Sequence, residues 1–171
     1  MKSSFTIISG IAAGLINCIA WYALSRTLTA YEVAAVDMYR LLIGLFLLIS
    51  GIFVCIFLKK KKNNGFIEFK SAFQTGVVFA LFMALILAIF NYLYYKFIAM
   101  DAVEFYVSEA KKQALENKVS AEDLPRFEER VRNYFSSFKM LMSTVMIGVI
   151  ISLIEAGILR KKAKTIPFSE N

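Results

Sequence analysis

One stretch of the chain decides its fold class: SAFQTGVVFALFMALILAIFNYLYY, residues 71–95. None of its residues carries a charge, and most are large and apolar. A run of about 18 or more apolar residues is long enough to cross the hydrocarbon core of a bilayer as an α-helix. The sequence therefore predicts a membrane-spanning helix here, over about residues 71–97 once the flanking aromatic residues are included.

Three further apolar runs of similar length lie outside this stretch. They predict spans over about residues 5–24, 39–58 and 138–159. Hydrophobic residues make up 58% of the chain, whereas an ordinary soluble domain is about half apolar. We therefore expect an all-α integral membrane protein, a four-transmembrane-helix bundle that forms one membrane domain over residues 1–171.

The distribution of charge predicts an orientation. The loop over residues 59–70 is basic, and so is the tail over residues 160–171, whereas residues 101–135 carry eight acids and six bases. Cytoplasmic loops carry an excess of Lys and Arg, so we expect the basic loop, the tail and both termini in the cytoplasm. The formal net charge of +7 fits contact with the lipid bilayer, and no nucleic-acid-binding pattern accompanies it. The loop begins with Lys59, Lys60, Lys61 and Lys62, which either fix the topology or also bind anionic headgroups.

The segment between the third and fourth spans, about residues 100–137, has helical periodicity of its own. It predicts an extracytoplasmic amphipathic helical hairpin, because two apolar stripes at helical spacing are separated by polar turn residues. The facing stripe of its first helix is rich in alanine and covers little area. We therefore expect a protein partner to cover the stripe of the second helix, which consists of Leu124, Phe127, Val131 and Tyr134.

Small residues recur every fourth position on three of the spans. Residues four apart share a helix face, and small side chains there let two helices approach closely in lipid. We expect these faces to pack the bundle, and the alternative is a homo-oligomer or contact with another membrane subunit. The residues are Gly10, Gly14, Gly76, Ala80, Ala84, Gly148, Ser152 and Ala156.

Three polar side chains within the predicted spans are candidates for a role inside the membrane. Glu155 is near the cytoplasmic end of its span and could pair with a lysine of the run 59–62; the sharper alternative is proton or ion coupling. Asn17 and Asn91 are expected to make hydrogen bonds between helices.

The sequence contains few of the residues and motifs on which enzyme active sites are usually built. There is no histidine, which removes His-based triads and His metal sites. Two cysteines cannot complete a zinc site that needs three or four. No glycine-rich phosphate loop is present. We therefore predict no catalytic residue, no metal site and no cofactor.

Several short motifs carry a family resemblance. They are Asn64-Gly65-x-Ile67-x-Phe69, Ala72-Phe73, Gly76, Ser120-Ala121-Glu122-Asp123-Leu124 and the ending Ile151-Ser152-Leu153-Ile154 to Lys161. Through them the chain resembles the DUF4199 family, which comprises small four-helix membrane proteins of unknown function that are common in Bacteroidota. Departures are Ala99-Met100, where the family often has Asn-Pro, and Glu155 at a usually small or apolar position. The resemblance implies a bacterial inner membrane location and no known activity. It also implies a possible partner, because members are often encoded near a membrane-associated glycosyltransferase.

Two functions are compatible with these observations. The first is a non-catalytic accessory or scaffold subunit of a membrane assembly, favoured by the small-residue faces and the amphipathic hairpin. The alternative is a small oligomeric transporter or channel that uses the polar residues within the spans.

Overall fold

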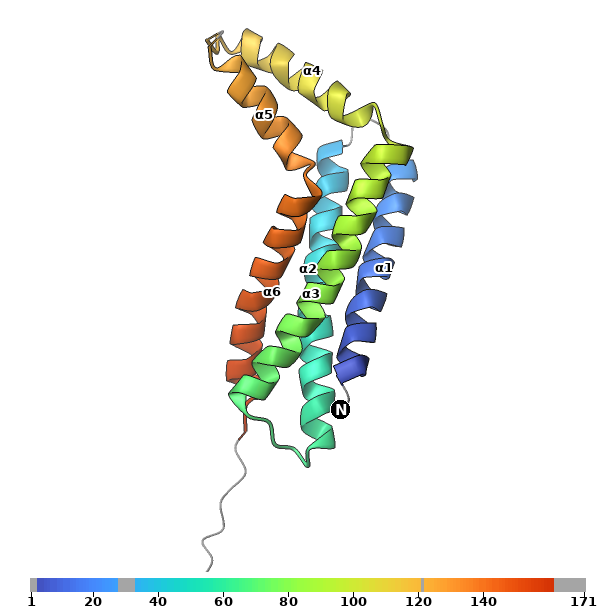
Figure 1. Cartoon of the computed structure of the whole chain (residues 1–171), viewed down its shortest axis with the longest axis vertical. Helices are drawn as coiled ribbons and strands as arrows, with labels where there is room; N and C mark the ends of the chain where they lie inside the picture. The colour runs from blue at the N-terminus through green and yellow to red at the C-terminus, as the bar shows by residue number, and fades with distance from the viewer. Residues whose placement is uncertain (1–2, 28–32, 121, 162–171) are drawn as a thin grey trace, which may run out of the picture.

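A computed structural model describes residues 3–27, 33–120 and 122–161 of the chain. In this part of the chain, four long α-helices lie side by side, and two shorter ones form a hairpin at one end of them (Figure 1). No strand occurs in the described residues beyond an isolated bridge between Ile67 and Lys161. The elements are α1 (Ser3–Thr27), α2 (Val33–Lys62), α3 (Phe69–Leu93), the π-helix η2 (Tyr94–Ile98), α4 (Ala102–Glu116), α5 (Leu124–Tyr134) and α6 (Ser137–Leu159).

The four long helices are long and apolar enough to cross a membrane. The segments that meet this condition are Ser4–Arg26, Met38–Lys62, Phe69–Ile98 and Ser137–Leu159. Their outward faces carry exposed Leu, Ile and Phe side chains, for example Ile8, Phe46 and Ile158. Surfaces of this kind suit a lipid environment, because large apolar patches are rare on soluble proteins. The prediction of an all-helical chain with four helices that are long and apolar enough to span a membrane is confirmed.

Helix α3 is the centre of the bundle. It packs against α6, α1 and α2, and its Phe79, Ala80 and Met83 are buried in the core. Phe79 lies directly over Gly51 of α2, where an added Cβ would clash with the ring. Glycine has no side chain and so leaves room for the Phe79 ring, which lets α2 approach α3 closely.

One end of the bundle, which we call the lysine end, holds the turn between α2 and α3. The predicted basic loop over 59–70 is shorter than expected, because α2 continues through the lysine run to Lys62. Asn64 (φ 52°) and Gly65 (φ 83°) then reverse the chain in the left-handed region, which glycine and asparagine tolerate best. Ile67 pairs with Lys161 through two backbone hydrogen bonds of 3.0 and 2.9 Å, so the turn is tied to the residues that follow α6.

The opposite end, which we call the hairpin end, begins where α3 changes into η2. The chain then forms α4 and α5, which pack against each other above the ends of the spans (Figure 1). Two ion pairs join them, Arg132 with Glu104 and Lys111 with Glu128. A hairpin of two helices was predicted for residues 100–137, and its helices occupy 102–116 and 124–134.

Candidate functional site

The small residues of α1 lie against α3. A Cβ added to Gly10 would come within 2.6 Å of the Phe79 carbonyl oxygen, and one added to Gly14 within 2.8 Å of the Ile86 Cβ. A real Cβ essentially never has a non-bonded neighbour closer than 3.0 Å. These two glycines therefore set how closely the α1 and α3 backbones approach each other.

The small residues of α3 and α6 meet each other. An added Cβ at Gly76 would clash with the Ser152 side chain, and one at Gly148 would clash with the Cβ of Ala80. Ala84 and Ala156 are fully buried. All eight predicted packing residues are thus buried within the chain itself, and the α3–α6 seam is the tightest contact that they form.

Asn91 of α3 forms hydrogen bonds with the junction between α5 and α6. Its Nδ2 donates hydrogen bonds to the Phe135 carbonyl oxygen at 2.9 Å and to the Ser137 Oγ at 3.0 Å. Phe135 and Ser137 flank the start of α6, so this buried amide fixes where α6 begins relative to α3.

Glu155 is 8% exposed, and its Oε2 has no hydrogen-bond partner among the described residues. The ion pair with the lysine run, suggested from sequence, is not formed by Lys59. The Lys59 Nζ instead donates to the Thr75 Oγ1 at 2.9 Å and to the Ser71 carbonyl oxygen at 3.3 Å. Lys59 is therefore already occupied by hydrogen bonds to α3.

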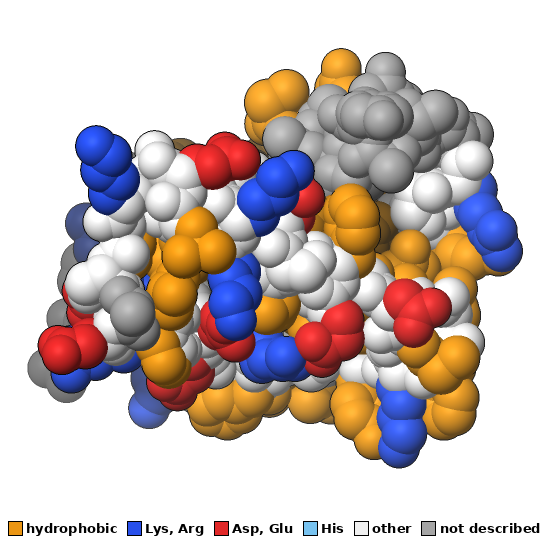
Figure 2. All heavy atoms as spheres, turned by 90° about the horizontal axis from the view of Figure 1, so that it is seen from above, with side chains coloured by type: hydrophobic (Ala, Val, Ile, Leu, Met, Phe, Trp, Pro, Cys, Tyr) orange, Lys and Arg blue, Asp and Glu red, His pale blue; other side chains and the backbone are white. Residues whose placement is uncertain are grey.

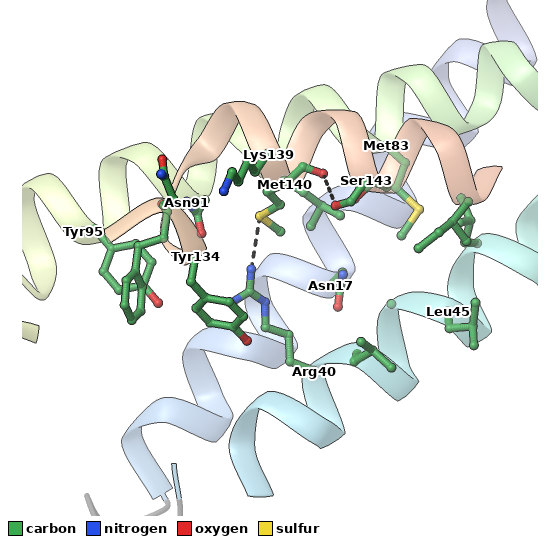
Figure 3. Close-up of a pocket in the computed structure, with 18 of the residues that line it drawn as sticks. Asn17, Arg40, Leu45, Met83, Asn91, Tyr95, Tyr134, Lys139, Met140 and Ser143 are labelled. Atoms are coloured by element: carbon green, nitrogen blue, oxygen red, sulfur yellow. Dashed lines mark hydrogen bonds between the residues drawn. The ribbon is translucent and has the colours of Figure 1, made fainter. Parts of the chain in front are cut away.

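Asn17 of α1 is the other buried polar residue with an unsatisfied atom. It is 4% exposed, and its Oδ1 has no hydrogen-bond partner among the described residues. It faces Gly44 of α2, where an added Cβ would lie 3.1 Å from the Asn17 Nδ2. Figure 3 shows Asn17 pointing into the space between α1, α2 and α6.

That space is a cavity of about 530 Å³ in the hairpin half of the bundle (Figure 3). Its lining comes from α1, α2, α3 with η2, α6 and the last turn of α5. The volume lies in the range of sites that hold drug-sized ligands. Neither Glu155 nor the lysine run contributes to its lining.

The lining of the cavity is polar at the hairpin end and apolar toward the middle of the bundle. Three cationic residues and no acid occur among the described lining residues. The cations are Arg40, Arg130 and Lys139. The amides are Asn17, Asn91 and Asn133, and the apolar residues include Leu41, Leu45, Leu48, Met83, Leu87 and Ile147.

Arg40 of α2 is held firmly at the mouth of this cavity. Its guanidinium carbon lies 3.7 Å from the centre of the Trp21 ring, a cation–π geometry that desolvation strengthens. Its Nη2 lies 3.1 Å from the Met140 Sδ (Figure 3). Sulfur is a weak acceptor, so the contact with Met140 takes up little of the hydrogen-bonding capacity of Arg40.

Sequence reasoning named Asn17 and Asn91 but did not join them to Arg40, Arg130 and Lys139. The available signal was that Arg40 and Lys139 both lie within a turn or two of the hairpin-end terminus of a span. Two cations near the same end of different helices indicate a shared site only if those helices are known to pack beside each other. The sequence did not show which helices are neighbours.

The four residues of the predicted partner face differ in how exposed they are. Leu124, Phe127 and Val131 are half-buried on α5, which packs on α4. Tyr134 is exposed. Packing of α4 on α5 thus partly buries most of the apolar stripe, and other large apolar side chains of the hairpin stay exposed to solvent.

A family model described as a protein of unknown function (DUF4199) matches residues 5–161. No curated protein and no solved structure matches the chain. The match covers all four spans and the hairpin, as the sequence resemblance implied.

Proposed function

We propose that this chain, which belongs to the DUF4199 family, is a non-catalytic accessory or scaffold subunit of a membrane assembly. The hairpin of α4 and α5 is its docking segment. The observation that carries the proposal is the exposure of large apolar side chains on a segment that stands beyond the spans. Phe105, Leu115 and Tyr134 are 56%, 55% and 65% exposed.

Such side chains favour a covered state. Burying one large apolar side chain is worth about 1.5–3 kcal/mol, so a partner that covers the three gains substantial affinity. Seen from above the hairpin end, apolar side chains alternate with charged ones across the hairpin (Figure 2). A mixed surface of this kind is typical of interfaces between proteins that also exist apart.

The orientation proposed from the charges agrees with this role. Lys59–Lys62 and Lys161 lie at the lysine end, opposite the hairpin (Figure 1). Positive charge favours the cytoplasmic side, which puts the hairpin on the extracytoplasmic side of a bacterial inner membrane. Glu122 and Asp123 at the hairpin tip are exposed and repel an anionic lipid surface. A protein partner therefore suits this face better than the bilayer does.

The test is purification in mild detergent of the tagged wild-type protein and a Phe105→Ser, Leu115→Ser double variant. We expect one stoichiometric membrane protein with the wild type and its loss with the double variant. Glu109→Ser is the matched control, because it changes an exposed polar residue of the same helix. Equal thermal stability of the three proteins separates docking from folding. An unchanged set of bound proteins in the double variant would contradict the docking role.

A small transporter or channel is the second candidate, and one observation favours it. Glu155 keeps a buried carboxylate oxygen without a partner among the described residues, and ionisable groups at membrane depth often belong to ion pathways. Proteoliposomes with an entrapped pH-sensitive dye test it directly. Proton flux in the wild type that Glu155→Gln removes would support the transporter, and equal rates with empty liposomes would exclude proton transport.

A further inference from the structure

We propose that the cavity at the hairpin end binds an anionic amphiphile, a phospholipid with a net negative head group. Its phosphate lies among Arg40, Arg130 and Lys139, and one acyl chain runs down the apolar wall between α2 and α6. This inference concerns the bundle and does not depend on the docking role of the hairpin.

The first support is charge. Three cations line the cavity without an acid among its described lining residues. None of the three ion pairs in the described part of the chain includes Arg40, Arg130 or Lys139. Like charges gathered at one place repel each other unless a counterion joins them. A phosphate oxygen is the natural counterion, because arginine and lysine both bind phosphate.

The second support is the gradient of polarity along the bundle axis. From Arg40 to Leu48 on α2, and from Lys139 to Ile147 on α6, the lining changes from cationic to apolar. Eight residues of helix span about 12 Å. An inorganic anion would use only the upper end of such a site. A molecule with a charged head and a hydrocarbon chain matches both ends.

The third support is a side opening toward lipid. Leu41 and Leu45 on α2 and Ile147 on α6 line the cavity and are also exposed on the outer surface of the bundle. Helix α6 packs chiefly on α3 and much less on α2. The α2–α6 side therefore offers an apolar rim through which an acyl chain can enter from the membrane while the rest of the lipid stays in the bilayer.

The fourth support is the amide of Asn17. This side chain is buried and points into the cavity (Figure 3). Its Nδ2 faces Gly44 of α2, which is one turn below Arg40, or about 6 Å. The ester groups of a phospholipid lie just below its phosphate. The Asn17 NH₂ can therefore donate a hydrogen bond to an ester carbonyl.

The experiment is native mass spectrometry of the purified protein with equal amounts of phosphatidylglycerol and phosphatidylcholine that carry the same acyl chains. We expect one phosphatidylglycerol retained in preference to phosphatidylcholine. Inorganic phosphate should not displace it, because phosphate lacks the chain. Displacement by inorganic phosphate would show a plain anion site, and equal retention of both lipids would show nonspecific lipid contact. Either result would overturn the proposal.

Variants locate the binding. Arg130→Gln with Lys139→Gln changes two exposed residues, so the fold should persist. A basic residue near a membrane contributes about 1 kcal/mol toward anionic lipid, or about fivefold in affinity, so the double variant should bind about 25-fold more weakly. Lys96→Gln is the matched control, since Lys96 is exposed at the same end but does not line the cavity. Equal losses in the control and the double variant would also overturn the proposal.

Discussion

The two halves of the bundle are built from the same four helices but packed in different ways. From the middle of the bundle toward the lysine end, Gly148 and Gly76 let α6 and α3 approach until no added Cβ would fit. Ile52 and Ile56 of α2 are fully buried there. Toward the hairpin end, α2 presents Arg40 and exposed leucines to a cavity. Small residues close one half, and cationic and amide residues hold the other half open.

This difference separates stability from binding. Tight packing of small residues drives helix association in lipid, so we expect most of the stability to come from the lysine half. Regions with few packed contacts are the ones that open or bind ligands. Substitutions in the two halves should therefore have different consequences even when they add the same side chain.

The largest effect is expected from Gly148→Leu. The new side chain would collide with Ala80, and overpacking of a tight interface costs about 3 kcal/mol, or roughly 10 °C in Tm. Thr144→Leu is the matched control, because it lies one turn away and lines the cavity, where a larger side chain has room. Thermal unfolding in detergent measures both. Equal losses from the two substitutions would mean that the halves do not differ in packing.

A smaller effect is expected from Asn91→Leu. It removes both hydrogen bonds to the start of α6 and leaves a carbonyl oxygen without its partner. We expect a loss of about 1 kcal/mol, seen as a Tm lower by about 3 °C. Asn133→Leu serves as the comparison, since it also lines the cavity but no hydrogen bond of its side chain occurs in the described residues. If Asn133→Leu costs as much, the hydrogen bonds of Asn91 are not the cause.

The smallest effect concerns the hairpin above the cavity. The Arg132 guanidinium, through its hydrogen bonds, holds the pKa of the Glu104 carboxyl below its ordinary value. Because the pKa of Glu104 is lowered, its ion pair with Arg132 stabilises the hairpin at neutral pH. This stabilisation is lost as the pH falls from the ordinary glutamate value of 4.5 through the lowered pKa. Spin labels at Glu109 and Glu129 should show a broader α4–α5 distance distribution in that acidic range. In the Glu104→Gln variant this acid-dependent broadening should be absent, because the carboxyl that titrates has been removed. If the distance distributions of both proteins respond to pH in the same way, the response does not come from Glu104.

The sequence was sufficient for the four long apolar helices and for small residues that the structure buries, because both depend on patterns within a single helix. Apolar length predicted the spans, and the four-residue spacing identified Gly10, Gly76 and Gly148. The bridge between Ile67 and Lys161 and the stacking of Arg40 on Trp21 join residues far apart in the chain, and no local pattern indicates such pairs. The cavity could not be predicted for the same reason, since its lining comes from five helices. Helix α2 also extends beyond residue 58, where the second span was predicted to end, because it continues through the lysine run to Lys62.

The central claim is that the open half of the bundle faces the extracytoplasmic side while the closed half excludes solvent. Impermeant maleimide labelling of single cysteines in intact spheroplasts tests it, in a background with Cys18→Ala and Cys55→Ala. Lys139→Cys at the cavity mouth should react before lysis, Lys62→Cys only after lysis, and Ser152→Cys in neither condition, because Ser152 is fully buried in the α3–α6 seam. Reaction of Lys139→Cys only after lysis, or of Ser152→Cys in intact spheroplasts, would contradict the account.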